Sequence, residues 1–206
     1  MNTSGLLDGV TVTSVDPRSV KQAMRERIRA ERRHRDMRRR AEDGRGLTTV
    51  ALEQPEIVTA RCVAAYTSTL DAPATQPLRQ ALRAAGVRVL LPVRLDDGHL
   101  DWSVDGDPAA EGTGARLGLA GIGQADVMIV PALAVDSLGN RLGQGEGFYD
   151  RTLRMIDPTV VVFAFVFESE VLDAAVEPVP AEPHDRPVDA VITPRRCLRL
   201  PPRRRP

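Results

Sequence analysis

Short apolar runs recur along the chain, separated by stretches in which apolar residues return at helical spacing. The runs that predict buried strands are residues 62–66, 87–91, 127–130, 160–167 and 188–192, with one more strand expected at 99–104. Helices predicted between them give a strand–helix–strand order, which implies parallel strands joined by right-handed crossovers. The pattern therefore predicts an α/β fold: a single-domain, open, three-layer, Rossmann-like sheet that is mostly parallel.

The first helix is predicted from its cap and its apolar stripe. Asp16 is a typical N-cap and precedes a proline, which is favoured in the first helical turn. The stripe is Val20, Met24 and Ile28, in a helix expected to reach about Arg40. Glycines at 44 and 46 predict a break before a weaker helix. The later helices are expected at residues 47–60, 77–85, 148–156 and 169–175.

Length and composition suit one globular domain with a sizeable core. The chain has 206 residues, of which 42% are hydrophobic and 27% charged. We expect a flexible leader at residues 1–15, the α/β domain at 16–198 and a Pro/Arg tail at 199–206. A stretch rich in glycine and alanine, residues 105–123, is predicted to be mostly loop.

The sequence argues against a membrane or secreted protein. The longest apolar run, residues 160–167, is too short to cross a bilayer, and no secretory signal is evident at the start. Cys62 and Cys197 lack metal-type spacing and are typical of reduced structural thiols. We therefore expect a cytoplasmic protein without a membrane partner, and a monomer by default.

A basic stretch at residues 25–40 raises the question of nucleic-acid binding. The formal net charge is +0 and aromatic residues make up 3% of the chain, so the basic stretch lacks interleaved stacking side chains. No nucleic-acid-binding motif is present either. The sequence predicts no nucleic-acid partner, and the basic face is expected to be solvated or to face phosphate groups.

The most informative polar pattern lies between residues 131 and 152. Gly143, Gly145 and Gly147 alternate there with larger residues, between Arg141 and Asp150. Glycines at this spacing let backbone N–H groups converge on an anion, and the positive end of the following helix would point there too. Arginine adds a forked phosphate donor, and aspartate offers hard oxygen to Mg²⁺. Ordinary turns also use these residues, but the whole pattern indicates a nucleotide polyphosphate site.

Lys21 is the only lysine in a chain whose other basic residues are arginines. Its presence suggests that a compact ammonium is required at this position. Arg25 lies one helical turn further on, so the two side chains can grip one target.

These motifs resemble those of the 5-formyltetrahydrofolate cyclo-ligase family, the methenyltetrahydrofolate synthetases. Family members share a strand ending in Val-Pro-x-Leu-Ala and then Gly-x-Arg-Leu-Gly-x-Gly-x-Gly-Tyr-Tyr-Asp-Arg, which residues 130–151 match with Phe148 for the first tyrosine and Val135 for a frequent phenylalanine. Their Lys-x-x-x-Arg helix is similar to Lys21 and Arg25. Further matches are Tyr-Thr-Ser at residues 66–68 and Pro-x-x-x-His-Asp-x-x-Val-Asp at 180–189. The resemblance covers roughly residues 20–195.

The resemblance implies ATP-dependent cyclisation of 5-formyltetrahydrofolate to 5,10-methenyltetrahydrofolate, through a phosphorylated formyl intermediate, with release of ADP and phosphate. It implies Mg²⁺ as cofactor, and ATP and a reduced folate as small-molecule substrates. By their matching positions, Lys21, Arg25 and Arg141 are expected to be catalytic. Asp150 and Asp185 are expected to hold the metal.

The same matching positions assign the ligand contacts. Residues expected to bind ATP are Lys21, Arg25, Arg141, Leu142, Gly143, Gln144, Gly145, Glu146, Gly147, Phe148 and Tyr149. Residues expected to bind the folate are Thr67, Gln144, Phe148 and Tyr149.

Two departures from the family pattern concern the folate. The family has Glu-x-x-Thr where this chain has Ala72 to Thr75, so Ala72 replaces a glutamate that grips the folate. Asp71, the neighbouring acid, is a candidate to replace it. The family's Glu-Pro motif is also missing from residues 112–125. The alternative to an active cyclo-ligase is therefore an ATP-binding relative with lost or altered folate activity.

Overall fold

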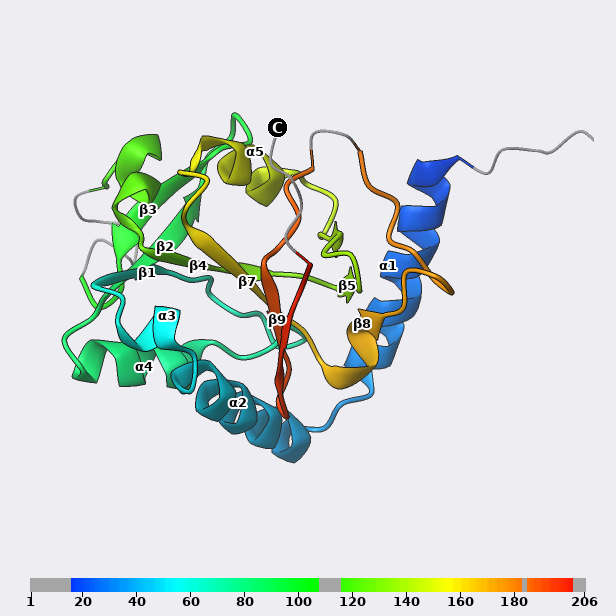
Figure 1. Cartoon of the computed structure of the whole chain (residues 1–206), viewed down its shortest axis with the longest axis horizontal. Coiled ribbons are helices and arrows are strands. Elements are labelled where there is room, and N and C mark those ends of the chain that lie inside the picture. The colour runs from blue at the N-terminus through cyan, green and yellow to red at the C-terminus, as the bar shows by residue number, and fades with distance from the viewer. Residues whose placement is uncertain (1–15, 108–115, 183–184, 202–206) are drawn as a thin grey trace, which may run out of the picture.

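The structure is a computed structural model that describes residues 16–107, 116–182 and 185–201 (Figure 1). The predicted leader at 1–15 lies outside these residues, as do the end of the predicted tail, 202–206, and residues 108–115 of the predicted loop. In the described part, one seven-stranded sheet occupies the centre and helices cover both of its faces.

The strands of this sheet follow the order β10-β9-β7-β4-β1-β2-β3. Their bounds are β1 Cys62–Ala64, β2 Arg88–Arg94, β3 Leu100–Val104, β4 Val127–Pro131, β7 Val161–Phe165, β9 Ala190–Ile192 and β10 Cys197–Arg199. The five inner strands are parallel, whereas the edge strands β3 and β10 run antiparallel to their neighbours. The predicted mostly parallel α/β fold is confirmed.

Alternate side chains of each inner strand enter separate cores on the two faces. On β4, Val127 and Ile129 pack with α2 (Met37–Leu52), α3 (Pro55–Val58) and α4 (Gln76–Ala84). Met128 and Val130 pack with α5 (Phe148–Met155) and the 3-10 helix η2 (Leu119–Gln124). Figure 1 shows α2, α3 and α4 below the sheet and α5 above it. Burial on both faces explains why these strands are continuous apolar runs.

A second sheet of three short strands lies beside the first and was not predicted. Its order is β6-β5-β8, with β5 at Ala134–Asp136, β6 at Arg141–Leu142 and β8 at Val171–Leu172. Helix α1 (Pro17–Arg33) packs its predicted apolar stripe, Met24 and Ile28, against Leu133 and Leu142 of this region. Strands of two or three residues are too short to show a two-residue period, so the pattern of apolar residues could not predict them.

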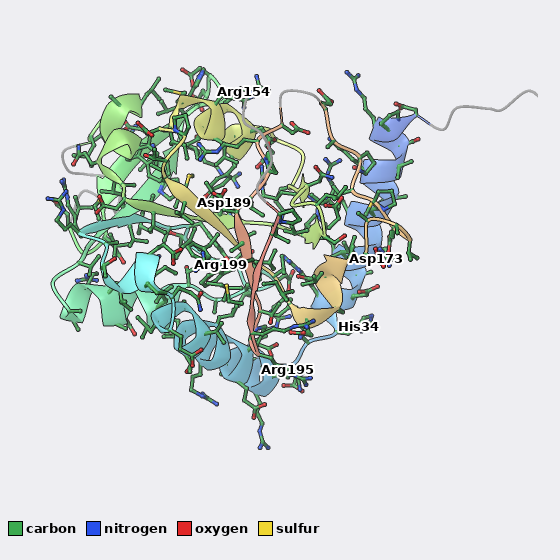
Figure 2. The ribbon with its side chains drawn as sticks, in the orientation of Figure 1. His34, Arg154, Asp173, Asp189, Arg195 and Arg199 are labelled. Atoms are coloured by element: carbon green, nitrogen blue, oxygen red, sulfur yellow. The ribbon has the colours of Figure 1, made fainter. Side chains whose placement is uncertain are left out.

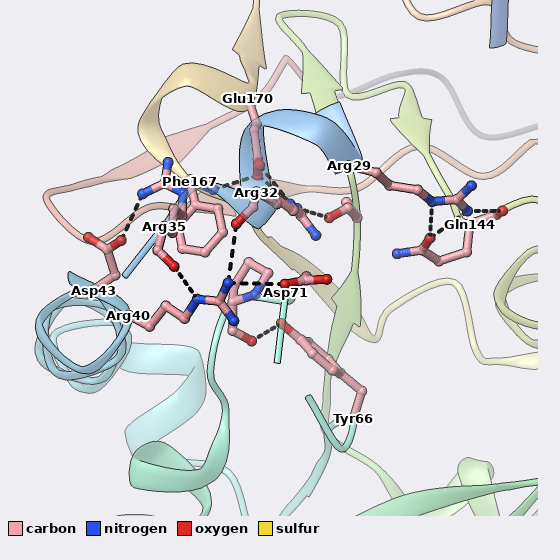
Figure 3. Close-up of polar contacts among 12 residues, drawn as sticks. Arg29, Arg32, Arg35, Arg40, Asp43, Tyr66, Asp71, Gln144, Phe167 and Glu170 are labelled. Carbon is pink, nitrogen blue, oxygen red and sulfur yellow. Dashed lines mark hydrogen bonds and ion pairs between the residues drawn. The ribbon is translucent and has the colours of Figure 1, made fainter. Parts of the chain in front are cut away.

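A buried ion pair fixes the C-terminal half of α1. Arg32, which is 2% exposed, donates to both carboxylate oxygens of Glu170, at 2.7 and 2.8 Å, and to the carbonyl of Ala132 at 2.7 Å. The guanidinium groups of Arg32 and Arg35 lie 5.4 and 3.7 Å from the ring centre of Phe167 (Figure 3). These contacts join the start of the chain to the segment just before β8.

The helices near the start differ from the prediction. Helix α1 ends at Arg33 rather than Arg40, because the side chain of Asp36 accepts the backbone N–H of Arg39 and caps a new helix, α2. The predicted glycine break is wrong, since Gly44 and Gly46 lie inside α2. A β-carbon on Gly46 would lie 2.3 Å from the carbonyl oxygen of Pro194, so close packing requires the glycine. The predicted helix at 47–60 is instead the end of α2 followed by α3.

Two later predictions also need correction, and one strand was not predicted. Strand β2 continues through Pro92 instead of stopping there, because its pairing with β1 ends at Leu90, opposite Ala64. No β1 residue therefore needs the N–H that Pro92 lacks, and the pairing with β3 continues. The helix expected at 169–175 is only a 3-10 turn, η3 (Glu168–Glu170), followed by β8. Strand β10 was not predicted; its Arg199, labelled in Figure 2, forms an ion pair with Glu56 of α3 at 2.7 Å.

Candidate functional site

A cleft of about 610 Å³ opens where β1 and β4 end, the edge at which α/β sheets bind ligands. The glycine loop, residues 143–147, forms one wall, and the chain just after β1 forms another. The residues that line the cleft are Arg29, Tyr66, Thr67, Thr69, Ala72, Pro92, Arg94, Leu100, Pro131, Arg141, Gly143, Gln144, Gly145, Glu146, Gly147, Phe148, Tyr149 and Asp150.

A smaller cavity of about 80 Å³ shares Arg141, Asp150 and the three loop glycines with the cleft. It adds Lys21 and Arg25 of α1, together with Leu142 and Asp185. Lys21 and the glycine loop were predicted to form one site, and in the structure both line this small cavity. Of the predicted set, Leu142 is fully buried against α1 and supports the wall.

Helix α1 presents cations to the loop from one face, at steps of one turn. Lys21 Nζ lies 3.6 Å from Asp185 Oδ2, and Arg25 Nε donates to the carbonyl of Gly143 at 2.9 Å. Arg29 continues the row and binds Gln144 (Figure 3). Burial, and after it repulsion from Arg29, lowers the pKa of the Arg25 guanidinium. This crowding of positive charge favours a polyanionic ligand.

The glycine loop presents backbone N–H groups that have no hydrogen-bond acceptor among the described residues. Gly145 and Gly147 have φ angles of 105° and 74°, which favour glycine, and Gly147 is the N-cap of α5. Within the described residues, none of the N–H groups from Gly143 to Tyr149 donates a hydrogen bond. Several of them adjoin the positive end of a helix, where an anion is stabilised.

Arg141 is held in the wall between the two cavities. Its side chain is 4% exposed, forms an ion pair with Asp150 and donates to the carbonyl of Pro131 at 3.2 Å. Its Nε is buried and has no partner among the described residues. A buried N–H without an acceptor is costly, so this position is suited to a ligand oxygen.

Aromatic rings close the cleft beside the loop. The guanidinium groups of Arg94 and Arg151 lie 5.2 and 5.6 Å from the ring centre of Phe148. Burial raises the pKa of the Tyr149 phenol well above its ordinary value, so that phenol stays neutral. The side chain of Glu146 pairs with Arg94 at 3.0 Å rather than pointing a free carboxylate at the cleft. The wall offers flat stacking surfaces bordered by cations.

Asp150 and Asp185, the expected metal ligands, both line the small cavity. Among the described residues no group of three or more His, Cys, Asp or Glu side chains could hold a metal ion. Two carboxylates nevertheless suit Mg²⁺, which commonly takes one or two carboxylates and completes its shell with water and phosphate oxygens. The donor set fits a magnesium ion that arrives with a nucleotide.

The chain after β1 forms the side on which the sequence departed from the family. Thr67 and Ala72 line the cleft, but Asp71 does not. Asp71 instead pairs with Arg40 of α2 at 3.1 Å (Figure 3), so it does not replace the missing glutamate. Tyr66 lines the cleft as well, with its hydroxyl donating to the carbonyl of Pro73 at 2.7 Å.

Sequence reasoning missed Arg29 and Arg94 of this site, and it gave no role to Arg151, the last residue of the glycine-loop motif. Arginine is so common in this chain that its presence alone carries no signal. For Arg29, the available signal was its spacing of four residues from Arg25, on the helix face that already carried Lys21.

Comparisons with known proteins agree with the geometry. The 5-formyltetrahydrofolate cyclo-ligase family profile matches residues 17–194. A 5-formyltetrahydrofolate cyclo-ligase of Mycolicibacterium smegmatis is 41% identical over 154 residues, covering 68% of this chain and 77% of the relative. One from Escherichia coli K12 is 33% identical over 180 residues, covering 81% and 96%.

Solved structures share the fold. The 5,10-methenyltetrahydrofolate synthetase of Aquifex aeolicus superposes with a TM-score of 0.73 at 21% identity, over 90% of this chain and 95% of that one. That of Mycoplasma pneumoniae gives 0.69 at 16% identity, over 84% and 98%. Family profile and curated relatives together show that the chain belongs to the 5-formyltetrahydrofolate cyclo-ligase family.

Proposed function

We propose that this chain closes 5-formyltetrahydrofolate to 5,10-methenyltetrahydrofolate at the expense of ATP. One observation carries the phosphate half of the proposal: the backbone N–H groups from Gly143 to Tyr149 donate to nothing in the described residues. They lie beside a row of cations in a cleft whose volume suits a small-molecule pair. Family membership supplies the reaction class.

On the phosphate side, the loop N–H groups would bind the oxygens of the triphosphate. Lys21, Arg25 and Arg141 border the small cavity from which the terminal phosphate would be transferred. The unpartnered Nε of Arg141 supports a contact with a phosphoryl oxygen. Phosphoryl transfer needs alignment and charge neutralisation more than covalent help, which is what these groups offer.

The reaction we propose has two steps. First, the formyl oxygen attacks the γ-phosphorus, the bond from that phosphorus to the bridging oxygen breaks, and ADP leaves. Next, N10 attacks the activated carbon and loses its proton, and the carbon–oxygen bond breaks to release phosphate. Because phosphate is a far better leaving group than the amide-like oxygen, the first step makes ring closure possible.

Asp150 and Asp185 would hold Mg²⁺, which neutralises phosphate charge when bound. Arg141 already orients Asp150 through their ion pair, and Lys21 lies against Asp185. The carboxylates are thus placed by the same cations that face the phosphates. This coupling supports one shared site for nucleotide and metal.

The folate would occupy the larger cleft. Thr67, Gln144, Phe148 and Tyr149 line it, and the aromatic rings offer stacking surfaces for a pterin. Ala72 supplies no carboxylate on the opposite side, which keeps open the alternative of an ATP-binding relative with altered folate activity.

The deciding experiment mixes purified protein with ATP, Mg²⁺ and 5-formyltetrahydrofolate and follows the absorbance of the methenyl product. We expect product only when both ATP and Mg²⁺ are present, with one ADP released per ring closed. ATP binding or hydrolysis without methenyl product would favour the alternative. In that case Ala72→Glu, which restores the family's acid, tests whether the missing carboxylate is the reason.

A further inference from the structure

Three carbonyl groups of the glycine loop accept hydrogen bonds from three different arginines. Gly143 O accepts from Arg25 Nε at 2.9 Å, and Gln144 O accepts from Arg29 Nη2 at 2.9 Å. Glu146 O accepts from Arg151 Nη2 at 3.0 Å. The first two donors come from α1 and the third from α5, so the loop is held from two elements.

The orientation of a carbonyl also fixes an N–H group. A trans peptide is planar, and its N–H points opposite to its carbonyl. Holding the carbonyls of residues 143, 144 and 146 therefore orients the N–H groups of Gln144, Gly145 and Gly147. These N–H groups are among those without a partner in the described part of the chain.

These hydrogen bonds are needed because the glycines do not by themselves fix the conformation of the loop. Gly145 and Gly147 adopt positive φ, and glycine occupies both halves of φ space at similar cost. A peptide flanked by glycines can rotate and turn its carbonyl oxygen toward the site, where the oxygen would repel a phosphate. An arginine that is hydrogen-bonded to the carbonyl disfavours this rotation.

From this geometry we propose that Arg29 and Arg151 are positioning residues that keep the glycine loop in its phosphate-binding conformation, an inference that rests on the proposed function. The family motifs assigned no ligand contact to either residue, although Arg151 is the last residue of the glycine-loop motif. Each acts on the ligand through the backbone: Arg29 through the peptide between residues 144 and 145, and Arg151 through the peptide between 146 and 147.

Both arginines donate through Nε and Nη2, a fixed spacing that a lysine cannot reproduce. Arg29 also binds Gln144 Oε1, through Nη2 at 2.8 Å and Nε at 3.2 Å (Figure 3). Arg151 Nε donates to the carbonyl of Gly98, in the turn between β2 and β3, at 2.6 Å. Arg151 thus joins the loop carbonyl to the β2–β3 turn, whereas Arg29 holds both the backbone and the side chain of Gln144. A lysine would keep the charge but would lose the planar fork, whose donors are fixed relative to one another.

The test measures ATP binding by calorimetry in the presence of Mg²⁺, for the wild type and for Arg29→Ala, Arg151→Ala, Arg29→Lys and Arg151→Lys. Matched controls are Arg33→Ala on α1 and Arg154→Ala on α5, two exposed arginines, the second labelled in Figure 2. We expect each alanine variant to bind ATP at least about tenfold more weakly. The lysine variants should keep a defect of several-fold, and the controls should match the wild type.

The outcomes separate this inference from the function on which it rests. Wild-type protein that binds no ATP would overturn both. Wild-type binding that is unchanged in folded alanine variants, or fully restored by lysine, would overturn only the positioning role, because restoration by lysine would mean that charge alone matters. If an alanine variant fails to fold, ATP binding by its lysine counterpart tests the positioning role instead, with a several-fold defect expected. Steady-state kinetics should show a raised KM for ATP with little change in the unfolding temperature.

Discussion

Lys21 and Arg141 are both cations of the site, but their surroundings differ. Arg141 is almost fully buried and is already held by Asp150 and a backbone carbonyl. Lys21 is 18% exposed, and its ammonium lies 3.6 Å from Asp185, a loose ion pair. A loosely paired ammonium can turn toward an incoming phosphate at little cost, whereas Arg141 acts as a fixed wall.

Replacing Lys21 by alanine should therefore weaken nucleotide use without harming the fold. We expect the KM for ATP to rise about 10- to 100-fold, because one charge-assisted contact to phosphate is lost. The KM for 5-formyltetrahydrofolate should change far less. Initial rates of methenyl formation at varied ATP measure this, with Arg33→Ala as the control. Wild-type kinetics in Lys21→Ala would contradict a contact between Lys21 and the bound ATP.

Among single residues, the sequence predicted most of those proposed to face the phosphate groups. It gave no role to the two arginines that hold the glycine loop. The loop glycines, Lys21 and Asp150 stand out because each is rare or unusually spaced in this chain. Arg29 and Arg151 do not, because their role depends on which carbonyl each reaches, and that depends on the packing of α1 and α5. The metal and ligand roles of the wall residues stay predictions.

Helix α1 is the element on which the site depends most. It packs on the small sheet through a narrow apolar stripe, and the Arg32–Glu170 pair fixes its far end. Both side chains of that pair are at most 3% exposed. Removing one partner of such a pair leaves a buried charge without compensation.

Glu170→Gln should accordingly destabilise the protein by about 3–5 kcal/mol. Urea unfolding followed by circular dichroism measures the change. Glu42→Gln is the matched control, because Glu42 pairs with Arg38 on the surface of α2 and its loss should cost at most about 1 kcal/mol. The double replacement Arg32→Met with Glu170→Gln should be less harmful than Glu170→Gln alone. Equal stability of Glu170→Gln and the control would contradict this account.

The elements themselves were predictable where burial dictates pattern. Inner strands such as β4 and β7, apolar on both faces, were found within one or two residues. The α1–α2 boundary was missed, because Asp36 resembles any other charged residue until its cap bond is seen. Gly46 was interpreted as a helix breaker although it serves close packing against Pro194, a contact between residues far apart in the sequence.

The whole molecule gathers its site from distant parts of the chain. Residues of α1 and of the segments after β1 and β4, together with Asp185, line two cavities that share several residues. In the described residues no helix is long and apolar enough to span a membrane. A ligand that bridges these parts should stabilise the folded state as a unit, since the unfolded chain offers no comparable site.

We therefore expect ATP with Mg²⁺ to raise the unfolding temperature. At about 100 times the dissociation constant, one bound ligand adds about 2.7 kcal/mol, which corresponds to about 5–10 °C for a domain of this size. Differential scanning calorimetry measures the shift, with Mg²⁺ alone and AMP as comparisons. A shift produced equally by AMP would mean that the triphosphate cradle is not what binds.

The distance in sequence between α1 and its partners bears on biosynthesis. Arg25 binds Gly143 and Arg32 binds Glu170, more than a hundred positions later. A ribosome-bound nascent chain therefore carries its cationic helix long before the acceptor loop has emerged from the exit tunnel. Until then, that helix is a basic segment without its docking surface, and nucleotide capture becomes possible only after residues 143–185 have emerged.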